Sequence, residues 1–361
     1  MNTTAAVSVV DATALVDAGV DVALGLDAFL DALAGPTIVR VAGHDRSRRR
    51  VLSGTIHGNE PSGARALHRL LRDGVVPATD LLLFFGALDA TRTEPRWTHR
   101  MPPGRRDLNR CFRGPFDDDN GRIAKAALDV LLAEPIEAAV DIHNTTGKNP
   151  DFIIAGVVDD ARCGLASLFS QRYLAWRLQL GTLSEVLDDV AVAITFECGQ
   201  TGDDAACERA WQGALRFATI DVLPRTGTPA ELFRDPVRVR LQPGTSLRFG
   251  DIGGGPVDTV DTVDTVDTVD GTVDVVLDRR IDRHNFTVIE AGTRLGTVRA
   301  GAPWPLRVDG DNTPEQDLSR RLFTVSNGAL LTAMPLVPMM MTTNAAVAQS
   351  DCLFYATIPG R

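Results

Sequence analysis

The chain has little positive charge and no long apolar runs, and each shortage excludes a class of protein. Its 361 residues include 37 lysines and arginines against 47 aspartates and glutamates, which gives a net charge of −10. Such an acidic chain lacks the basic surface that sequence-independent nucleic-acid binding requires. Because no apolar run approaches the roughly 18 residues of a membrane-spanning helix, we expect no membrane partner either.

The N-terminal region lacks the features of a signal peptide. It has no basic stretch before its first apolar run, and it carries Asp11, Asp17 and Asp21. The cysteines are scattered and include no Cys-x-x-Cys pair; they are Cys111, Cys163, Cys198, Cys207 and Cys352. This usage argues against a disulfide framework and against a thiolate zinc site. We therefore expect a cytoplasmic protein.

A chain of this length most readily forms two domains. Residues 1–36 are expected to be a peripheral segment that ends in a helix. From residue 37 to 224, short apolar or β-branched runs alternate with helical stretches, which predicts an α/β domain with a mostly parallel, buried sheet. The expected strands are residues 37–41, 50–56, 80–85, 138–143, 152–158 and 190–197. The expected helices are residues 61–72, 122–132, 161–176 and 204–223.

The helical signals stop near residue 224, and short strands separated by glycine and proline follow. Residues 225–361 are therefore expected to form a C-terminal β domain, with strands near residues 237–241, 287–290, 294–299, 322–325 and 353–358. Within it, residues 257–270 form a low-complexity tract in which aspartate recurs at every third position. This spacing does not match that of a calcium-binding loop, so we expect a surface loop.

The first segment with metal-binding residue types is His57-Gly-Asn-Glu60, where an expected strand gives way to a helix. A histidine and a glutamate on one tight turn can face one point, and two histidines with a glutamate form a known ligand set of catalytic zinc. A hydrogen-bonded histidine and a helix-start glutamate would give the same pattern. His143, which ends the strand expected at residues 138–143, is the candidate third ligand. We expect surface or structural roles for the other histidines, His44, His68, His99 and His284.

Two further segments carry charged residues that suit catalysis or binding. The segment Asp107-Leu-Asn-Arg110 follows Arg100 and two more arginines in an otherwise acidic chain. Arginines bind carboxylates through paired hydrogen bonds, although a solvated basic loop would look the same. Glu197 ends an apolar strand, where a carboxylate is either a buried structural partner or a general base with a raised pKa.

In this order, the four segments resemble the zinc carboxypeptidase superfamily (M14-like), and more closely its succinylglutamate desuccinylase/aspartoacylase branch. The resemblance covers residues 37–220 by motif and the C-terminal domain loosely. The Asn-Thr-Thr after His143 and the Cys-Gly-Gln after Glu197 are typical of this branch. The resemblance implies a mixed, mostly parallel sheet flanked by helices, plus a C-terminal all-β domain.

The resemblance also implies a metal site. His57, Glu60 and His143 would bind one Zn²⁺ per chain. Asp107 would accept a hydrogen bond from the free ring nitrogen of His57 and fix its orientation. Glu197 would activate the zinc-bound water and then pass the proton to the leaving amine.

Four more residues acquire implied roles toward the substrate. Arg100 would polarise the scissile carbonyl, although the two arginines at positions 105 and 106 are alternatives. Asn109 and Arg110 would hold a substrate carboxylate. Tyr355, the one tyrosine of the C-terminal domain, would contact the substrate.

The implied reaction is hydrolysis of an amide bond, because zinc acidifies water and polarises a carbonyl. We predict a zinc amidohydrolase whose partner is a small N-acyl amino acid that carries a carboxylate. A metallocarboxypeptidase acting on peptide C-termini is the alternative if the C-terminal domain leaves the groove open. A non-catalytic protein that binds a metal or a small molecule is a third hypothesis. The acyl group and the amino acid stay undetermined, as does assembly into a homo-oligomer.

Overall fold

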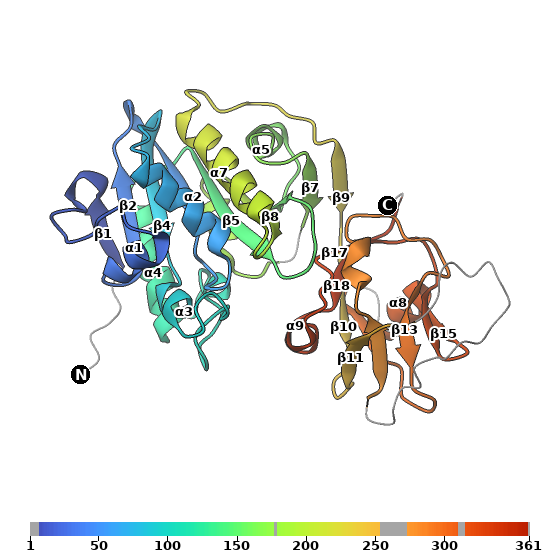
Figure 1. The fold of residues 1–361 in the computed structure, drawn as a ribbon. Helices are drawn as coiled ribbons and strands as arrows, with labels where there is room; N and C mark the ends of the chain where they lie inside the picture. The colour runs from blue at the N-terminus through green and yellow to red at the C-terminus, as the bar shows by residue number, and fades with distance from the viewer. Residues whose placement is uncertain (1–6, 177–178, 253–272, 310–314, 360–361) are drawn as a thin grey trace. The chain divides into compact units, whose positions relative to one another are not determined.

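The computed structural model describes residues 7–176, 179–252, 273–309 and 315–359 (Figure 1). The low-complexity tract at residues 257–270 lies outside the described residues, so its expected role as a surface loop stays a prediction. The chain forms two compact units. The first contains residues 1–145 and 151–233, and the second contains residues 146–150 and 234–361.

The first unit is built on one nine-stranded sheet. Its strands are β1 (Ser8–Asp11), β2 (Thr37–Val41), β3 (Asp45–Ser53), β4 (Thr79–Phe85), β5 (Ala138–Thr145), β6 (Phe152–Ala155), β7 (Arg172–Ala175), β8 (Val192–Gln200) and β9 (Glu231–Arg234). They lie in the order β1-β2-β4-β3-β5-β8-β6-β7-β9. The β2–β4 and β6–β8 pairs are antiparallel, whereas the pairs β1–β2, β3–β4, β3–β5, β5–β8 and β6–β7 are parallel.

Helices cover both faces of this sheet (Figure 1). They are α1 (Leu26–Ala32), α2 (Pro61–Arg72), α3 (Leu88–Arg92), α4 (Asp119–Leu131), α5 (Asp160–Ala166), α6 (Leu183–Leu187) and α7 (Asp204–Thr219), with short 3₁₀ turns at Ala12–Ala14 and Leu108–Arg110. Because successive strand residues face opposite sides, Leu52 joins the core under α1, α2, α5 and α7, and Val51 joins the core under α4 and α6. The expected mixed, mostly parallel sheet flanked by helices is confirmed.

The second unit contains two smaller sheets around one apolar core. Its strands are β10 (Val237–Leu241), β11 (Leu247–Gly250), β12 (Val275–Asp278), β13 (Arg294–Val298), β14 (Leu306–Asp309), β15 (Phe323–Ser326), β16 (Ala329–Thr332), β17 (Val337–Met339) and β18 (Phe354–Thr357). The sheet orders are β14-β10-β18-β17 and β11-β12-β13-β16-β15. The unit also contains α8 (Glu315–Leu322), α9 (Ala345–Ser350) and a 3₁₀ turn at Ile281–His284, so it is mainly rather than wholly β.

Residues 146–150 join the second unit through several hydrogen bonds, although they follow β5 of the first. The Asn149 side chain accepts a hydrogen bond from the backbone N–H of Met340 (3.0 Å). Asn285 donates to the carbonyl oxygen of Lys148 (3.0 Å). The expected continuous domain of residues 37–224 therefore lacks this short segment.

Some expected elements are wrong. The helix expected at residues 161–176 ends at Ala166, and Arg172–Ala175 forms β7. The Ser170 hydroxyl accepts a hydrogen bond from the Arg172 N–H, and the side chain of Tyr173 is fully buried as β7 pairs with β6. This long-range pairing overrides the local helix preference. The strand expected at residues 287–290 is reduced to one bridge between Ile289 and Leu336. The N-terminal segment, by contrast, lies at the edge of the sheet as β1 and ends in α1, which agrees with the expected peripheral segment that ends in a helix.

Within the described ranges, no helix has both the length and the apolar character needed to cross a membrane.

A fully buried arginine ties the centre of the sheet to the end of α7. Arg50 on β3 donates to the Glu137 carboxylate (2.7 Å) and to the carbonyl oxygens of Phe217 (2.8 Å) and Ile220 (2.7 Å). A buried charge of this kind is tolerated because its donors are paired.

Replacing Arg50 with methionine should lower the free energy of unfolding by about 3–5 kcal/mol, because it removes the side-chain donor of the Phe217 and Ile220 carbonyls and leaves Glu137 with Arg48 alone. Denaturant unfolding measures this change. Arg46→Met is the matched control, since the Arg46 side chain is 71% exposed and its ion pair with Asp80 should contribute little. Equal losses in the two variants would contradict a stabilising role for Arg50.

Candidate metal centre

Three side chains converge at the carboxyl ends of two neighbouring parallel strands. His57 and Glu60 lie in the turn between β3 and α2, and His143 lies on β5, which pairs with β3. The Nδ1 atom of His57 is 2.9 Å from Glu60 Oε1, and that of His143 is 2.7 Å from Glu60 Oε2. In the described part of the chain, this is the one group of three such residues whose ligand atoms all lie within 4.8 Å of one another.

Close backbone packing shapes the turn that carries His57 and Glu60. A side chain at Gly58 would overlap with Ala90 and the His99 carbonyl, so glycine is needed there. The N–H of Gly58 donates to the Arg100 carbonyl oxygen (3.0 Å). Pro61 follows Glu60 as the first residue of α2, a position that proline favours because its missing N–H is not needed there.

The outer ring nitrogens of both histidines face carboxylates. His57 Nε2 is 3.0 Å from Asp107 Oδ1, and His143 Nε2 is 2.7 Å from Asp141 Oδ2. Because ionised carboxylates only accept hydrogen bonds, a neutral, metal-binding ring would carry its proton on Nε2 and would present its lone pair at Nδ1. The two Nδ1 atoms are 3.1 Å apart, beside the Glu60 carboxylate.

This donor set fits a divalent cation such as zinc. Two imidazole lone pairs and a carboxylate repel one another unless a positive charge lies between them, and zinc favours nitrogen and oxygen ligands of this type. Burial opposes the charged form of His143, but Asp141 and Glu60 outweigh it and raise the pKa of His143 well above its usual value. The same carboxylates that would favour a metal therefore favour a proton in its place.

Asp107 is held between His57 and Arg100. Arg100 donates to Asp107 Oδ2 from Nε (3.0 Å) and Nη2 (2.9 Å), and its Nη1 lies 3.4 Å from Glu60 Oε1. Burial alone would raise the pKa of Asp107, but His57 and Arg100 lower it well below its usual range. The Arg100 side chain thus lies next to the metal centre, with two of its nitrogens on Asp107.

Asn109 and Arg110 follow Asp107 in the same short turn. Asn109 Oδ1 accepts a hydrogen bond from the N–H of Leu183 (2.9 Å), and its Nδ2 lies 3.3 Å from His143 Nε2. Arg110 donates to the carbonyl oxygen of Asn109 (2.9 Å) and is half-buried. The structure therefore brings Asn109 to a candidate ligand and Arg110 to the same turn; their contact with a substrate carboxylate stays a prediction.

Glu197 lies on β8 directly opposite His143 on β5. Residues paired in this way on parallel strands face the same side of a sheet, and Glu197 is close enough to His143 and Glu60 for their charges to act on it. Burial raises the pKa of Glu197 to about 8. Its Oε2 atom has no hydrogen-bond partner in the described residues. A carboxyl group with this pKa can both take and give a proton near neutral pH.

Two residues stand apart from the expected set. Tyr355 belongs to the second unit, on β18, where it is buried opposite Arg238, and its contact with a substrate stays a prediction. Asp141, which touches His143, is not among the residues that the sequence singled out as functional. The Asp-x-His spacing at the end of a strand was the available signal, because residues two apart on a strand share a face.

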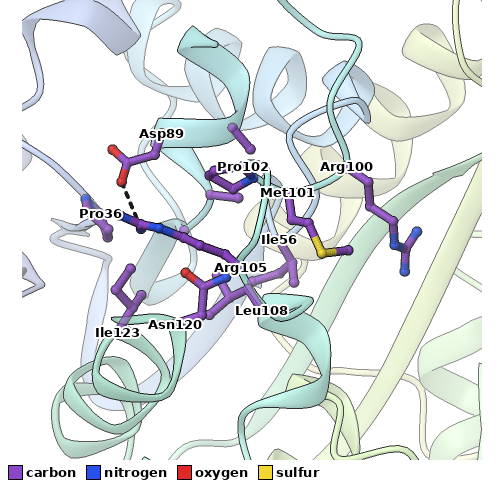
Figure 2. A pocket seen from close by; sticks show the side chains of 13 residues that line it. Pro36, Ile56, Asp89, Arg100, Met101, Pro102, Arg105, Leu108, Asn120 and Ile123 are labelled. Carbon is purple, nitrogen blue, oxygen red and sulfur yellow. Dashed lines mark hydrogen bonds and ion pairs between the residues drawn. The ribbon is translucent and has the colours of Figure 1, made fainter. Parts of the chain in front are cut away.

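A separate pocket lies beside the loop that carries Arg100 (Figure 2). Apolar side chains including Ile56, Met101 and Leu108 line it, and Arg105 there pairs with Asp89 (3.2 Å). The guanidinium group of Arg100 points away from the other lining residues (Figure 2). None of the three candidate ligands lines this pocket, so it is distinct from the metal centre.

The geometry predicts one Zn²⁺ per chain in protein that has been stripped of metal and reloaded. His143→Ala should reduce binding to background, because it removes one of three converging donors. Metal analysis after dialysis, with calorimetric titration, measures the stoichiometry. His44→Ala, at an exposed position, should bind as the wild type does. Full zinc occupancy in the His143 variant would contradict this ligand assignment.

A comparison with known protein families links the segment that carries this site to one family. Residues 47–170 match the model of the succinylglutamate desuccinylase/aspartoacylase catalytic domain. This segment includes the three candidate ligands and ends before Glu197. No curated protein sequence matches the chain significantly.

Solved structures share the fold over most of the chain. The succinylglutamate desuccinylase from Chromobacterium violaceum is 17% identical, with a TM-score of 0.53, and the match covers 90% of this chain and 88% of that one. Murine aminoacylase 3 is 16% identical, with a TM-score of 0.53 and coverage of 87% and 96%. The product-bound ectoine utilization protein EutE from Ruegeria pomeroyi is 17% identical, with a TM-score of 0.52 and coverage of 89% and 88%.

At these identities the solved structures establish the fold, and the family model adds the catalytic segment. The matched segment contains the whole turn from His57 to Glu60 and the strand that carries His143. On this evidence, residues 47–170 match the catalytic domain of the succinylglutamate desuccinylase/aspartoacylase family, and the chain shares its fold with a solved succinylglutamate desuccinylase.

Proposed function

We propose that the protein is a zinc-dependent amidohydrolase that removes the acyl group from an N-acyl amino acid. The observation that carries the proposal is the convergence of His57, Glu60 and His143, whose possible ligand atoms all lie within 4.8 Å of one another. The names of two structural relatives, succinylglutamate desuccinylase and aminoacylase 3, support an acylated amino acid as the substrate class.

His57, Glu60 and His143 would hold the zinc ion, which supplies Lewis acidity toward a carbonyl oxygen and lowers the pKa of water. Glu197 would remove a proton from the attacking water and deliver it to the amine nitrogen as the amide bond breaks. Its buried carboxyl, with a pKa of about 8, suits both transfers. Arg100, beside Glu60, would stabilise the negative charge that develops on the carbonyl oxygen.

Substrate binding would depend on the turn after Asp107. Asp107 ties this turn to His57 and to Arg100, so Asn109 and Arg110 are held at a fixed place beside the centre. A carboxylate of the substrate would pair with Arg110, which positions the scissile amide near Glu197.

Glu197→Gln should lower turnover by about 10²–10⁴-fold, because glutamine cannot accept and return the proton. Zinc stoichiometry should be unchanged, since Glu197 is not one of the three ligands. Steady-state kinetics on N-succinyl-, N-acetyl- and N-formyl-amino acids, paired with metal analysis, test both statements.

Glu208→Gln, on the exposed side of α7, is the matched control and should keep full activity. Near-wild-type turnover in the Glu197 variant would remove this residue from the mechanism.

Arg110→Ala should lower kcat/KM by roughly ten- to a hundredfold for acidic N-acyl amino acids, because it removes a charge-assisted contact of about 1.5–3 kcal/mol. The loss should be small for a neutral analogue that lacks the carboxylate. Arg105→Ala, in the same loop but paired with Asp89, is the control and should affect the two substrates alike.

Equal losses on charged and neutral substrates in the Arg110 variant would show that Arg110 is structural. A wild-type preference for multi-residue peptides would replace the proposed deacylase with a metallocarboxypeptidase.

A further inference from the structure

Asp141 is a deeply buried carboxylate whose hydrogen bonding is directed at one residue. Its side chain is 2% exposed, and its Oδ2 atom lies 2.7 Å from His143 Nε2. The second oxygen, Oδ1, has no hydrogen-bond partner among the residues described here. A carboxylate that served only to hold the fold together would spread its bonds over several groups, so this arrangement points to His143 as its target.

The contrast with Asp107 sharpens this point. Asp107 also contacts a candidate ligand, but it accepts two hydrogen bonds from Arg100 and one from the N–H of Asn109. Its negative charge is therefore offset by a fixed cation. In the described ranges, no arginine or lysine forms an ion pair with Asp141.

The groups beside Asp141 on the neighbouring strands are polar but uncharged. Ser53 on β3 and Thr195 on β8 both lie in register with it. The Thr195 hydroxyl bonds to the Ser184 hydroxyl (2.7 Å), and the Ser53 hydroxyl has no partner in the described structure. Neither of these two neighbours supplies a positive charge, and a buried carboxylate without one is costly.

We propose that Asp141 is the positioning residue of His143, and that its buried charge is balanced through the imidazole ring by the metal ion. The carboxylate fixes the ring so that Nδ1 faces Glu60, and it increases the basicity of that nitrogen. This inference rests on the proposed metal centre. It assigns the two carboxylates different roles: Asp107 joins His57 to the turn that carries Asn109, whereas Asp141 orients the ring of His143.

Two substitutions at Asp141 separate the effect of its charge from its effect on the orientation of the His143 ring. In Asp141→Asn the amide oxygen can still accept the hydrogen bond from Nε2, so the variant loses the charge only. Asp141→Ala loses both. Ser53→Ala is the matched control, because it removes a buried, unpartnered hydroxyl at the same level of the sheet.

Zinc dissociation constants from competition with a chelator provide the readout, together with the unfolding midpoint of each metal-free protein. We expect zinc binding about 10–100-fold weaker in Asp141→Asn and weaker still in Asp141→Ala. Ser53→Ala should stay within about twofold of the wild type. The metal-free unfolding midpoint of Asp141→Asn should be no lower than that of the wild type, because the variant removes a buried charge that no arginine or lysine offsets.

Wild-type affinity in Asp141→Asn overturns the inference, as does an equal loss of affinity in the Ser53 control. If the variants do not fold, nitrogen-15 NMR of the zinc-loaded wild type provides the second measurement. A protonated Nε2 with a strongly deshielded proton is expected for His143, and an unprotonated Nε2 overturns the inference.

The outcomes also distinguish this inference from the proposed function. A wild-type protein that binds zinc but hydrolyses no N-acyl amino acid contradicts the function and leaves the role of Asp141 standing. A wild-type protein that binds no zinc contradicts both.

Discussion

Parallel pairing of β3, β5 and β8 is the constraint on which the candidate centre depends. Parallel strands end at the same edge of a sheet, so the residues that follow β3 and those that end β5 and β8 are brought together from distant parts of the chain. The register is equally important. A shift of one residue on β5 would turn His143 to the opposite face and leave His57 and Glu60 without it. The strands are buried where they pair, at Arg50 to Leu52 on β3 and at Val140 on β5, and a shifted register would expose these side chains or force them to repack.

The candidate centre is rich in negative charge, and few fixed cations offset it. Glu60, Asp107, Asp141 and Glu197 lie around two histidines, and Arg100 is bound to Asp107 and lies near Glu60. Such a cluster is unfavourable as an empty collection of carboxylates, because like charges in a buried site repel. It becomes favourable when a divalent ion occupies the middle. The arrangement is therefore better suited to binding a metal than to stabilising the fold.

The sequence was informative where structure is local. Pro61 and the apolar spacing after it predicted α2 correctly from Pro61 to Arg72, and the alternation of strands and helices predicted the sheet. The sequence did not predict those elements whose structure depends on contacts between distant residues. Tyr173 sits in a strand because β6 offers it a partner, and no local signal at residues 172–175 reveals that pairing. The burial of Arg50 could not be predicted from the sequence for the same reason, since its hydrogen-bond partners lie more than 80 residues away.

The candidate site shows the same division. The turn of His57 and Glu60 is short enough to be recognised from spacing, and the structure brings His143, Asp107, Asn109 and Glu197 around it. Asp141 was overlooked although it lies two residues from His143, because an aspartate within a buried strand also fits a structural role. The roles of Arg110 and Tyr355 toward a substrate depend on a ligand, which no sequence pattern contains.

Residues 146–150 belong to the second unit, although the residues before and after them in the sequence belong to the first. Gly147 passes so close to the Met341 carbonyl that no larger residue fits, and Asn149 bonds to the backbone of Met340. A fragment that starts at Arg234 would lack both. Recombination between relatives at a single crossover near residue 233 would likewise join a new second unit to a foreign five-residue segment. The two regions therefore form one structural unit, although more than 80 residues separate them in the sequence.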